Sequence, residues 1–271
     1  MTSHRPVRHV RRLLVPLVAA GTAAALTLGI APASQAHHAD PPGPVNAQTT
    51  YDWGKPIWQD DFVGGLKDIW RTRSPHGNVR NQHGMLTLNT GKRGSVSAKL
   101  KGTGHETGRW EIRLRSRQYG HDHGHYKVRT ELVPAAKRPQ NCGARNVALN
   151  SYTLGGNRAH HYIRSLPANQ STSHTGLNLG NDRWHTFAVE VTEKRISWFV
   201  DAHVISTETR PEALSNVPYT VRFTMLAPNA DKRMNPSRMQ MDWLRYFTLR
   251  KPNSQSVEAP LPRSGSYADA C

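Results

Sequence analysis

Acidic side chains are scarce in this sequence. Its 271 residues include 19 aspartates and glutamates against 36 lysines and arginines, and residues 132–181 contain no acidic residue at all. That absence excludes a pair of catalytic carboxylates anywhere in the stretch. The formal net charge of +17 can serve solubility alone, or it can attract a polyanion such as an acidic polysaccharide, a cell-wall polymer or nucleic acid.

Cysteines and ligand motifs are also few. The chain has no zinc-ligand spacing and no glycine-rich phosphate loop, so we expect no nucleic-acid partner and favour a polysaccharide. The two cysteines, Cys142 and Cys271, could pair in an oxidising compartment, and two free thiols are the alternative. A disulfide between them would tie the C-terminal tail to the edge of a predicted strand.

Long apolar runs are confined to the N-terminus. Residues 1–36 begin with arginines, continue through an Ala-rich apolar run and end on Ser34 and Ala36, at the spacing that a signal peptidase recognises. This pattern predicts a secretory signal peptide, and the adjacent Arg11 and Arg12 would also suit a twin-arginine route. A membrane anchor is the alternative. No later run is long enough for a transmembrane helix, so we expect a secreted protein without a membrane partner.

Removing residues 1–36 takes away four arginines and no acidic residue, so the rest of the chain keeps a formal charge of +13. Residues 37–50 and 251–271 are rich in Pro, Ser, Asn and Ala, and we expect both segments to be extended or mobile. A single folded domain is predicted over residues 51–250, and we expect it to be a monomer.

The alternation of apolar and polar residues predicts the fold class. At least ten short runs between residues 84 and 250 alternate in this way, and Gly, Pro, Asn and Asp clusters separate them. A period of two is typical of antiparallel strands buried on one face. Only "RPEALSN" (210–216) could form a helical turn. The pattern therefore predicts an all-β fold, a two-sheet antiparallel β-sandwich or jelly roll.

Several of these runs, in order, resemble the family 16 glycoside hydrolases, the laminarinase and β-glucanase group. "IWQDDFVGGLKDIWRT" (57–72) resembles the family's opening strand, and "GHETGRWEIRLRS" (104–116) resembles a later strand. "DRWHTFAVEVTEKRISWFVDAHVI" (182–205) resembles its Trp-His strand and the following hairpin. The resemblance implies a bent jelly roll of the concanavalin A type, with a polysaccharide lying along a concave groove.

The resemblance also implies where catalytic acids should lie. One strand of the family carries Glu-x-Asp-x-x-Glu, or a form one residue shorter, and a retaining glycosidase needs two carboxyls about 5–5.5 Å apart. The aligned stretch "GARNVALNS" (143–151) has Ala144 at the nucleophile position, Asn146 at the middle position and Ala148 or Leu149 at the acid/base position. None of these can attack a sugar or protonate a leaving group.

The neighbouring run "HYKVRTELVPAAKRP" lacks the tryptophans that the family uses to line its groove. Alternation directs Val128 and Leu132 to the core, and Lys127, Arg129 and Glu131 to the groove. The positions expected to line the groove from the next strand are Ala144, Asn146, Ala148 and Asn150. The prediction is a cationic, amide-rich groove with one carboxylate.

Carbohydrate binding on a hydrolase scaffold is the first hypothesis for this groove. Cationic side chains pair with carboxylates or sulfates, amides hydrogen-bond hydroxyls, and aromatic rings stack on sugars. Core packing is the alternative for the tryptophans, notably Trp184 and Trp198. The candidate carbohydrate-binding residues are Trp110, Tyr126, Lys127, Arg129, Arg145, Asn146, Asn150 and Trp184.

The second hypothesis is an active glycoside hydrolase with relocated acids around Glu131. Nearby cations favour an ionised carboxyl, so Glu131 would suit a nucleophile or base, and a salt bridge to Arg129 or Arg145 is its simpler role. The other candidate groups are Glu111, Asp122, His125 and His161. The third hypothesis is a structural cell-wall protein without a sugar site.

Metal and cofactor sites receive little support from the sequence. "GHDHGHY" (120–126) puts His121, His123 and His125 at strand spacing, where three imidazoles on one face could hold zinc or copper, but its glycines favour an exposed loop. The resemblance implies a structural calcium on the convex side, for which Asp60, Asp61 and Asp242 are the available acids. We assign no metal and expect no cofactor.

Overall fold

The structure, a computed structural model, describes residues 45–136, 146–164, 169–229, 231–251 and 260–261. Within these residues fifteen strands form two antiparallel sheets, joined by loops, one short helix and one 3-10 turn. The predicted all-β sandwich is confirmed. No helix in the described ranges has the length and apolar composition that a membrane crossing requires.

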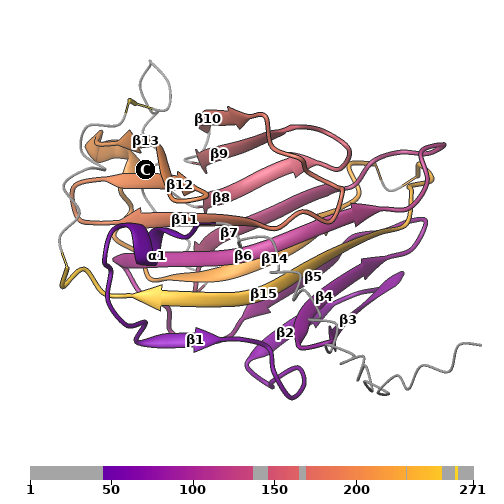
Figure 1. Ribbon diagram of the computed structural model, residues 1–271, viewed down its shortest axis with the longest axis horizontal. Coiled ribbons are helices and arrows are strands. Elements are labelled where there is room, and N and C mark those ends of the chain that lie inside the picture. The colour runs from indigo at the N-terminus through magenta and orange to yellow at the C-terminus, as the bar shows by residue number, and fades with distance from the viewer. Residues whose placement is uncertain (1–44, 137–145, 165–168, 230, 252–259, 262–271) are drawn as a thin grey trace, which may run out of the picture. The chain divides into compact units, whose positions relative to one another are not determined.

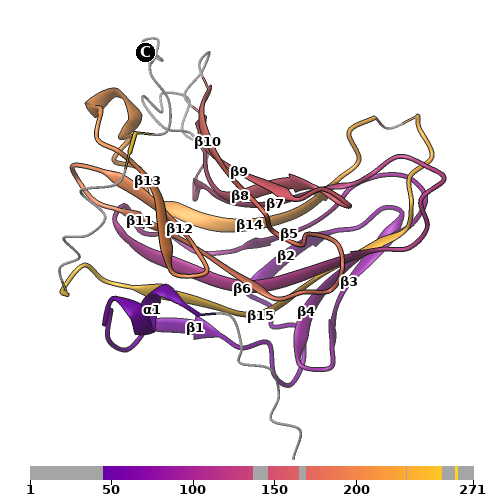
Figure 2. The ribbon, with the colours of Figure 1, turned by 45° about the horizontal axis from the view of Figure 1, so that its top comes forward.

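The two sheets form two layers, with β14 and β7 above β6 and β15 in Figure 2, and Figure 1 gives the strand labels. The eight-stranded sheet has the order β13 (His203–Glu208), β12 (Ile196–Val200), β11 (His185–Val191), β6 (Gly108–Gln118), β15 (Ser237–Phe247), β4 (Met85–Thr90) and β3 (Gly77–Gln82), and β1 (Trp58–Asp60) pairs with β15. The seven-stranded sheet has the order β10 (Asn169–Thr175), β9 (Arg158–Arg164), β8 (Asn146–Thr153), β7 (Lys127–Pro134), β14 (Tyr219–Leu226), β5 (Val96–Leu100) and β2 (Trp70–Arg73).

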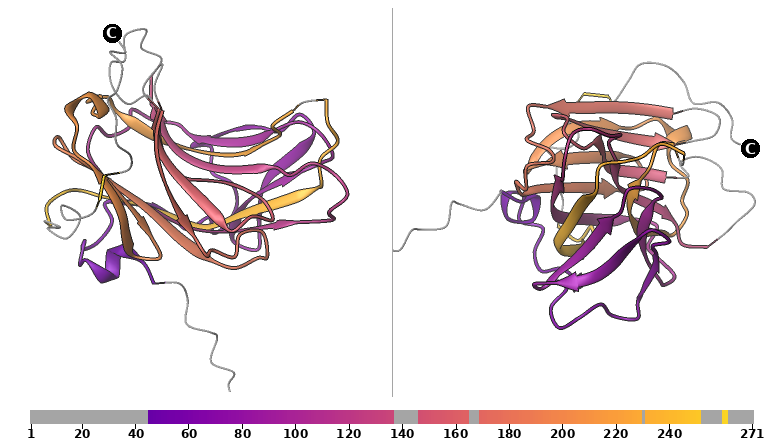
Figure 3. Two further views of the ribbon diagram at one scale, coloured as in Figure 1. Left: turned by 90° about the horizontal axis from the view of Figure 1, so that it is seen from above. Right: turned by 90° about the vertical axis from the view of Figure 1, so that its right-hand side faces the viewer.

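The core lies between the two curved sheets, which Figure 3 shows from two further sides. Alternate residues of each strand face inward, so Ile112 of β6 and Val128 and Leu132 of β7 are fully buried. Trp198 of β12 is also fully buried, and its indole nitrogen donates a hydrogen bond of 3.0 Å to the carbonyl of Ala148 in the opposite sheet. Core packing is therefore the observed role of Trp198.

The chain before the first strand is more ordered than its composition predicts. Residues Ala47–Thr50 form helix α1, and the Asn46 side chain caps it by accepting from the Thr49 backbone nitrogen at 2.9 Å. Ala47 is fully buried in an apolar cluster with Trp53, Phe199 and Phe247. The prediction of an extended segment is wrong for these residues, because a small apolar cluster anchors them.

A buried carboxylate of β6 holds this helix. Glu111 is fully buried and accepts hydrogen bonds from the backbone nitrogens of Ala47 and Gln48. Burial raises the pKa of Glu111 to about 7, and the two backbone donors and Arg245 only partly oppose that shift. Glu111 is thus an anchor for the N-terminal helix and lies away from the groove that the sequence predicts.

Other expectations have mixed outcomes. The turn expected within residues 210–216 is present as the 3-10 turn η1 (Pro211–Ala213), whereas β10, which contains no apolar residue, was not anticipated. The predicted signal peptide, the two cysteines and most of the C-terminal tail lie outside the described residues, so those predictions stay untested.

Candidate carbohydrate-binding groove

The outer face of the seven-stranded sheet concentrates positive charge. Cross-strand pairing places Lys99 opposite Arg222, and Arg222 opposite Glu131, so all three side chains share this face. Glu131 is the only acidic residue in these seven strands. The strands also contain eight cationic residues: Arg71, Arg73, Lys99, Lys127, Arg129, Arg158, Arg164 and Arg222.

Two hollows lie on this face. The first, of about 530 Å³, lies over β5, β14 and β7, and its lining includes Arg129, Glu131 and Arg222. The second, of about 440 Å³, lies over β7, β8 and β9, and its lining includes Arg129, His160 and Tyr162. Arg129 lines both hollows, so the two are neighbours along one groove. The predicted orientation of Lys127, Arg129 and Glu131 is confirmed.

Glu131 is tied into an ion pair at the floor of the first hollow. Its carboxylate accepts from Arg222 Nη2 at 2.7 Å, from the Tyr162 hydroxyl at 2.5 Å and from Asn146 Nδ2 at 3.4 Å. Burial alone would raise the pKa of Glu131, but the charge of Arg222, the hydrogen bonds and Arg129 outweigh it and hold the pKa below its usual range. The salt-bridge role is therefore observed, with Arg222 instead of Arg129 as the partner.

A β-bulge in β8 decides which of its residues face the groove. Glu131 lies opposite Ala148 and Thr130 lies opposite Asn150, which leaves Leu149 as the extra residue, packed in the core. On β9, Tyr162 lies opposite Ala148 and His160 lies opposite Ser151. The groove-facing positions at the spacing i, i+2 and i+5 are therefore Asn146, Ala148 and Ser151. These are an amide, a methyl group and a hydroxyl, with no carboxyl among them.

The bulge overturns one predicted groove residue. Asn150 points into the interior beside Thr130 and is fully buried, because the bulge reverses the alternation after Leu149. Within the described residues, neither polar atom of the Asn150 side chain nor the Thr130 hydroxyl has a hydrogen-bond partner. Two further candidate positions, Ala144 and Arg145, lie outside the described residues.

The three aromatic candidates for sugar binding, Trp110, Tyr126 and Trp184, all lie away from the groove. Tyr126 is fully buried, and its hydroxyl donates to the carbonyls of Gly91 and Gly94. Trp184 lies on the opposite side of the sandwich, between Arg113 and Arg115, whose guanidinium carbons are 4.8 and 4.6 Å from its ring centroid. Tyr126 is buried because it is in phase with Val128 and Leu132 of the same run, whereas Trp184 was misplaced because sequence alone does not show which sheet lies beside it.

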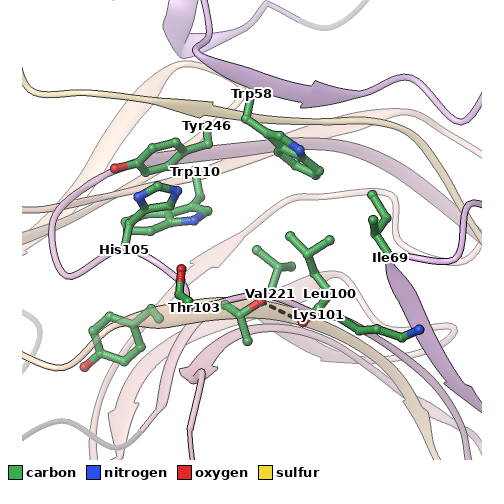
Figure 4. A pocket seen from close by; sticks show the side chains of 13 residues that line it. Trp58, Ile69, Leu100, Lys101, Thr103, His105, Trp110, Val221 and Tyr246 are labelled. Carbon is green, nitrogen blue, oxygen red and sulfur yellow. Dashed lines mark hydrogen bonds between the residues drawn. The ribbon is translucent and has the colours of Figure 1, made fainter.

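The third aromatic, Trp110, lines a separate apolar cavity of about 200 Å³ at one end of the sandwich. Figure 4 shows Trp110 together with Trp58 and Tyr246 around this space. The His105 ring stacks on Tyr246 with a centroid separation of 3.9 Å. This cavity belongs to the space between the sheets and is distinct from the cationic groove.

Three important groove residues were missed by the sequence reasoning: His160, Tyr162 and Arg222. A signal was present, since "RAHHYIR" and "YTVRFTML" alternate and place these residues on the same face as the other polar positions. What was missing was the strand order, which brings β9 and β14 to either side of β7 and β8.

Two groups on this face, Lys99 and His160, have pKa values below their usual range. Burial, together with Arg222 and Arg71, lowers the pKa of Lys99. Burial, together with Arg158 and Lys127, lowers the pKa of His160. Like charges resist a further proton, so His160 is neutral at neutral pH while the arginines keep their charge.

Two of the three acids suggested as calcium ligands, Asp60 and Asp242, form ion pairs elsewhere. Asp60 is buried and accepts from Lys67 Nζ at 2.8 Å and from the Trp70 indole at 2.9 Å. Asp242 pairs with Arg113 at 2.8 Å. The histidine-rich segment 120–126 is a loop, as its glycines indicated. Across the described ranges, no three acidic, histidine or cysteine side chains are grouped so as to hold a metal ion.

Comparison with known proteins shows which solved structures share this fold. No model of a known protein family matches the chain, and no curated protein sequence matches it. Among solved structures, the catalytic domain of an endo-1,3-β-glucanase (laminarinase) from Thermotoga petrophila RKU-1 superposes with a TM-score of 0.59 at 14% identity, covering 73% of this chain and 98% of that chain. The chain has the fold of the family 16 laminarinases.

Two further structures support the same conclusion. The laminarinase from Rhodothermus marinus has a TM-score of 0.58 at 16% identity and covers 72% of this chain and 97% of its own. SCLam, a non-specific endo-β-1,3(4)-glucanase from family GH16, has a TM-score of 0.58 at 15% identity, with coverages of 72% and 91%. The family resemblance predicted from the sequence motifs is thereby confirmed at the level of the fold.

Proposed function

We propose that this protein binds an anionic polysaccharide along the groove of the seven-stranded sheet. The observation that carries the proposal is the imbalance of eight cationic residues against one carboxylate in the strands of this face. Lined with Lys, Arg, Asn and Ser side chains, the groove offers charge-assisted hydrogen bonds to carboxylates or sulfates and neutral ones to hydroxyls. Secretion, which the features of residues 1–36 support, would expose the groove to extracellular polymers.

The fold supports a polysaccharide as the partner. Two solved structures that share it are named as an endo-1,3-β-glucanase (laminarinase) and a non-specific endo-β-1,3(4)-glucanase, so both act on polysaccharides by name. In this chain the groove carries no pair of carboxyls at hydrolytic spacing among the described residues, since Glu131 is single. Glu131 is also held ionised, so it cannot act as the proton donor of a hydrolase.

Calorimetric binding of the purified protein to a polyuronate and to a neutral β-1,3-glucan tests the proposal. We expect the polyuronate to bind and its affinity to fall as salt is raised, because exposed charge pairs are screened. Arg129→Ala should weaken this binding about tenfold, the cost of one charge-assisted hydrogen-bonding group. Arg117→Ala is the matched control, because Arg117 lies on the other sheet and pairs with Asp182.

Two outcomes would count against the proposal. Salt-independent binding of the neutral glucan with no preference for the polyuronate would remove the anionic specificity. Failure to bind any polysaccharide, in a protein shown to be folded, would favour the structural cell-wall hypothesis instead.

A further inference from the structure

The second hollow combines three kinds of group that a proton abstraction next to a carboxylate requires. Arg129, His160 and Tyr162 all line it. We propose that this hollow cleaves a 4-linked uronate polysaccharide by β-elimination: Arg129 binds the uronate carboxylate, His160 removes the proton from C5 and Tyr162 protonates the departing O4. This inference rests on the anionic polysaccharide recognition proposed above.

Arg129 is available to bind a carboxylate. It comes from the middle of β7, its side chain lines both hollows, and among the described residues it makes no ion pair or hydrogen bond. A guanidinium paired with a uronate carboxylate withdraws charge from it and stabilises the negative charge that develops when C5 loses its proton. Binding and activation of the substrate would thus use the same side chain.

His160 suits the role of the base. It lies on β9 opposite Ser151, and its exposed ring lines the hollow. Burial of part of the ring, together with Arg158 and Lys127, keeps its pKa low, so the neutral imidazole has a free nitrogen lone pair at neutral pH. None of the described residues hydrogen-bonds to this ring.

Tyr162 suits the role of the acid. Its hydroxyl donates to Glu131 at 2.5 Å, and burial together with the charge of Glu131 raises its pKa, so the proton stays on the phenol. The guanidinium carbon of Arg164 lies 5.6 Å from the Tyr162 ring centroid, and Arg129 and Arg164 both act to lower that pKa. These cations would stabilise the phenolate left after proton transfer.

The residues opposite this pair leave room for a sugar. Ala148 lies across from Tyr162 and Ser151 lies across from His160, so β8 presents small side chains to this pair. The second hollow has a volume of about 440 Å³. The small side chains of β8 therefore leave space in which a sugar ring could lie.

The elimination balances without a co-reactant. The C5 proton moves to His160, and the electron pair of the C5–H bond forms the double bond between C4 and C5. The bond between C4 and O4 breaks with its electron pair on the oxygen, and the Tyr162 hydroxyl turns from Glu131 to give its proton to that oxygen. Solvent then carries the extra proton from the imidazolium back to the phenolate. The products are a new saccharide end and an unsaturated uronate.

The unsaturated uronate absorbs in the ultraviolet, and hydrolysis forms no such chromophore. The test incubates the purified protein with four 4-linked polyuronates, built of mannuronate, guluronate, galacturonate or glucuronate, and follows ultraviolet absorbance, reducing ends and binding in parallel. We expect chromophore and reducing ends to appear together on at least one polymer. Tyr162→Phe and His160→Gln should each lower the rate at least 100-fold while the polymer still binds.

Matched controls lie away from the groove. Tyr119→Phe removes an exposed hydroxyl in the loop after β6, and His203→Gln replaces an exposed imidazole on β13. Both should leave the rate unchanged. Because His160 is exposed, its substitution should leave the fold intact, which keeps the test valid even if Tyr162→Phe, at a buried site, lowers stability.

Each other outcome overturns a defined part of the argument. Reducing ends without the chromophore would show hydrolysis, and a chromophore that survives both substitutions would place the chemistry on other residues. Binding to the polyuronates without any product would overturn elimination and leave the proposed function standing. Absence of binding would overturn the proposed function itself.

Discussion

The two outer faces of this sandwich carry nearly equal numbers of cations and treat them differently. The strands of the eight-stranded sheet contain seven arginines and five acidic residues, whereas those of the seven-stranded sheet contain eight cations and one acid. On the first face Arg109 pairs with Glu190 at 2.5 Å and Arg113 pairs with Asp242 at 2.8 Å. On the second face, Arg222 pairs with Glu131 at 2.7 Å, and among the described residues the other seven cations of these strands form no ion pair with a carboxylate.

The comparison separates two uses of arginine. On the eight-stranded sheet, six of the seven arginines form ion pairs or stack on an aromatic ring. The guanidinium carbon of Arg245, for example, lies 4.1 Å from the Trp243 ring centroid. On the seven-stranded sheet most of the positive charge has no acidic partner within the strands, which costs self-repulsion in the folded protein and would be offset if an anionic polymer occupied the groove, as proposed above. Four predictions test that contrast, from the largest expected effect to the smallest.

The largest effect should come from breaking the buried ion pair between Arg109 and Glu190 on the eight-stranded sheet. Glu190→Gln leaves Arg109, only 1% exposed, without its charge partner, and should lower the free energy of unfolding by about 3–5 kcal/mol. Glu131→Gln should cost less, about 1–2 kcal/mol, because Arg222 is 37% exposed and can turn toward water. Denaturant titrations of both variants measure the difference, and equal losses would contradict the contrast between the faces.

The second prediction concerns pH and the anchor of helix α1. The pKa of Glu111 is raised in the folded state, so its stabilising contribution is complete below its unfolded value of about 4.5 and is lost as pH rises through about 7. The loss should reach about 3 kcal/mol relative to Glu111→Gln. Unfolding free energies of both proteins at pH 4.5, 6 and 8 measure it, and parallel pH profiles would show that Glu111 does not titrate in this range.

The third prediction concerns an acidic residue introduced on the cationic face of the seven-stranded sheet. Ser151 lies opposite Arg129 across β7 and β8, so Ser151→Glu should give Arg129 an ion-pair partner and weaken polyuronate binding about tenfold. Ser151→Gln has nearly the same size without the charge and serves as the control. If both variants lose affinity equally, steric blockage of the hollow explains the loss and the charge argument fails.

The smallest effect on stability and binding is expected from a substitution on the eight-stranded sheet. Arg117→Ala removes a side chain that is 55% exposed, lies 3.7 Å from Asp182 and is 5.5 Å from the Tyr119 ring centroid. It should change the free energy of unfolding by less than about 1 kcal/mol. A thermal melt, together with a polyuronate titration, checks that neither stability nor binding moves further; a clear loss of binding would mean that the ligand also reaches this face.

The sequence predicted the fold well because the signal was repeated. Ten alternating runs with turn residues between them leave few alternatives to a two-sheet sandwich, and the motifs gave the family of the fold. Strands without apolar residues, such as β10, escaped detection because their pairing depends on a neighbour and not on a buried face of their own. Helix α1 escaped because four residues carry no periodic pattern.

The candidate site was predicted only in part. Lys127, Arg129 and Glu131 were placed correctly because β7 alternates regularly along its whole length. Trp184 was misplaced because charge and aromaticity look the same on either sheet until the strand order is known. Asn150 was misplaced because the prediction continued a strict alternation through β8, which the bulge reverses after Leu149.

That bulge has a practical consequence for anyone who alters this groove. Before the bulge the even-numbered residues of β8 face the groove, and after it the odd-numbered residues do. A library that varies every second residue from Asn146 would therefore alter two positions at the groove and then two in the core, Asn150 and Tyr152. Such a library would lose most of its members to misfolding and would be read as evidence that the groove tolerates no change. The productive set continues after the bulge with Ser151 and Thr153, where new side chains would meet the ligand.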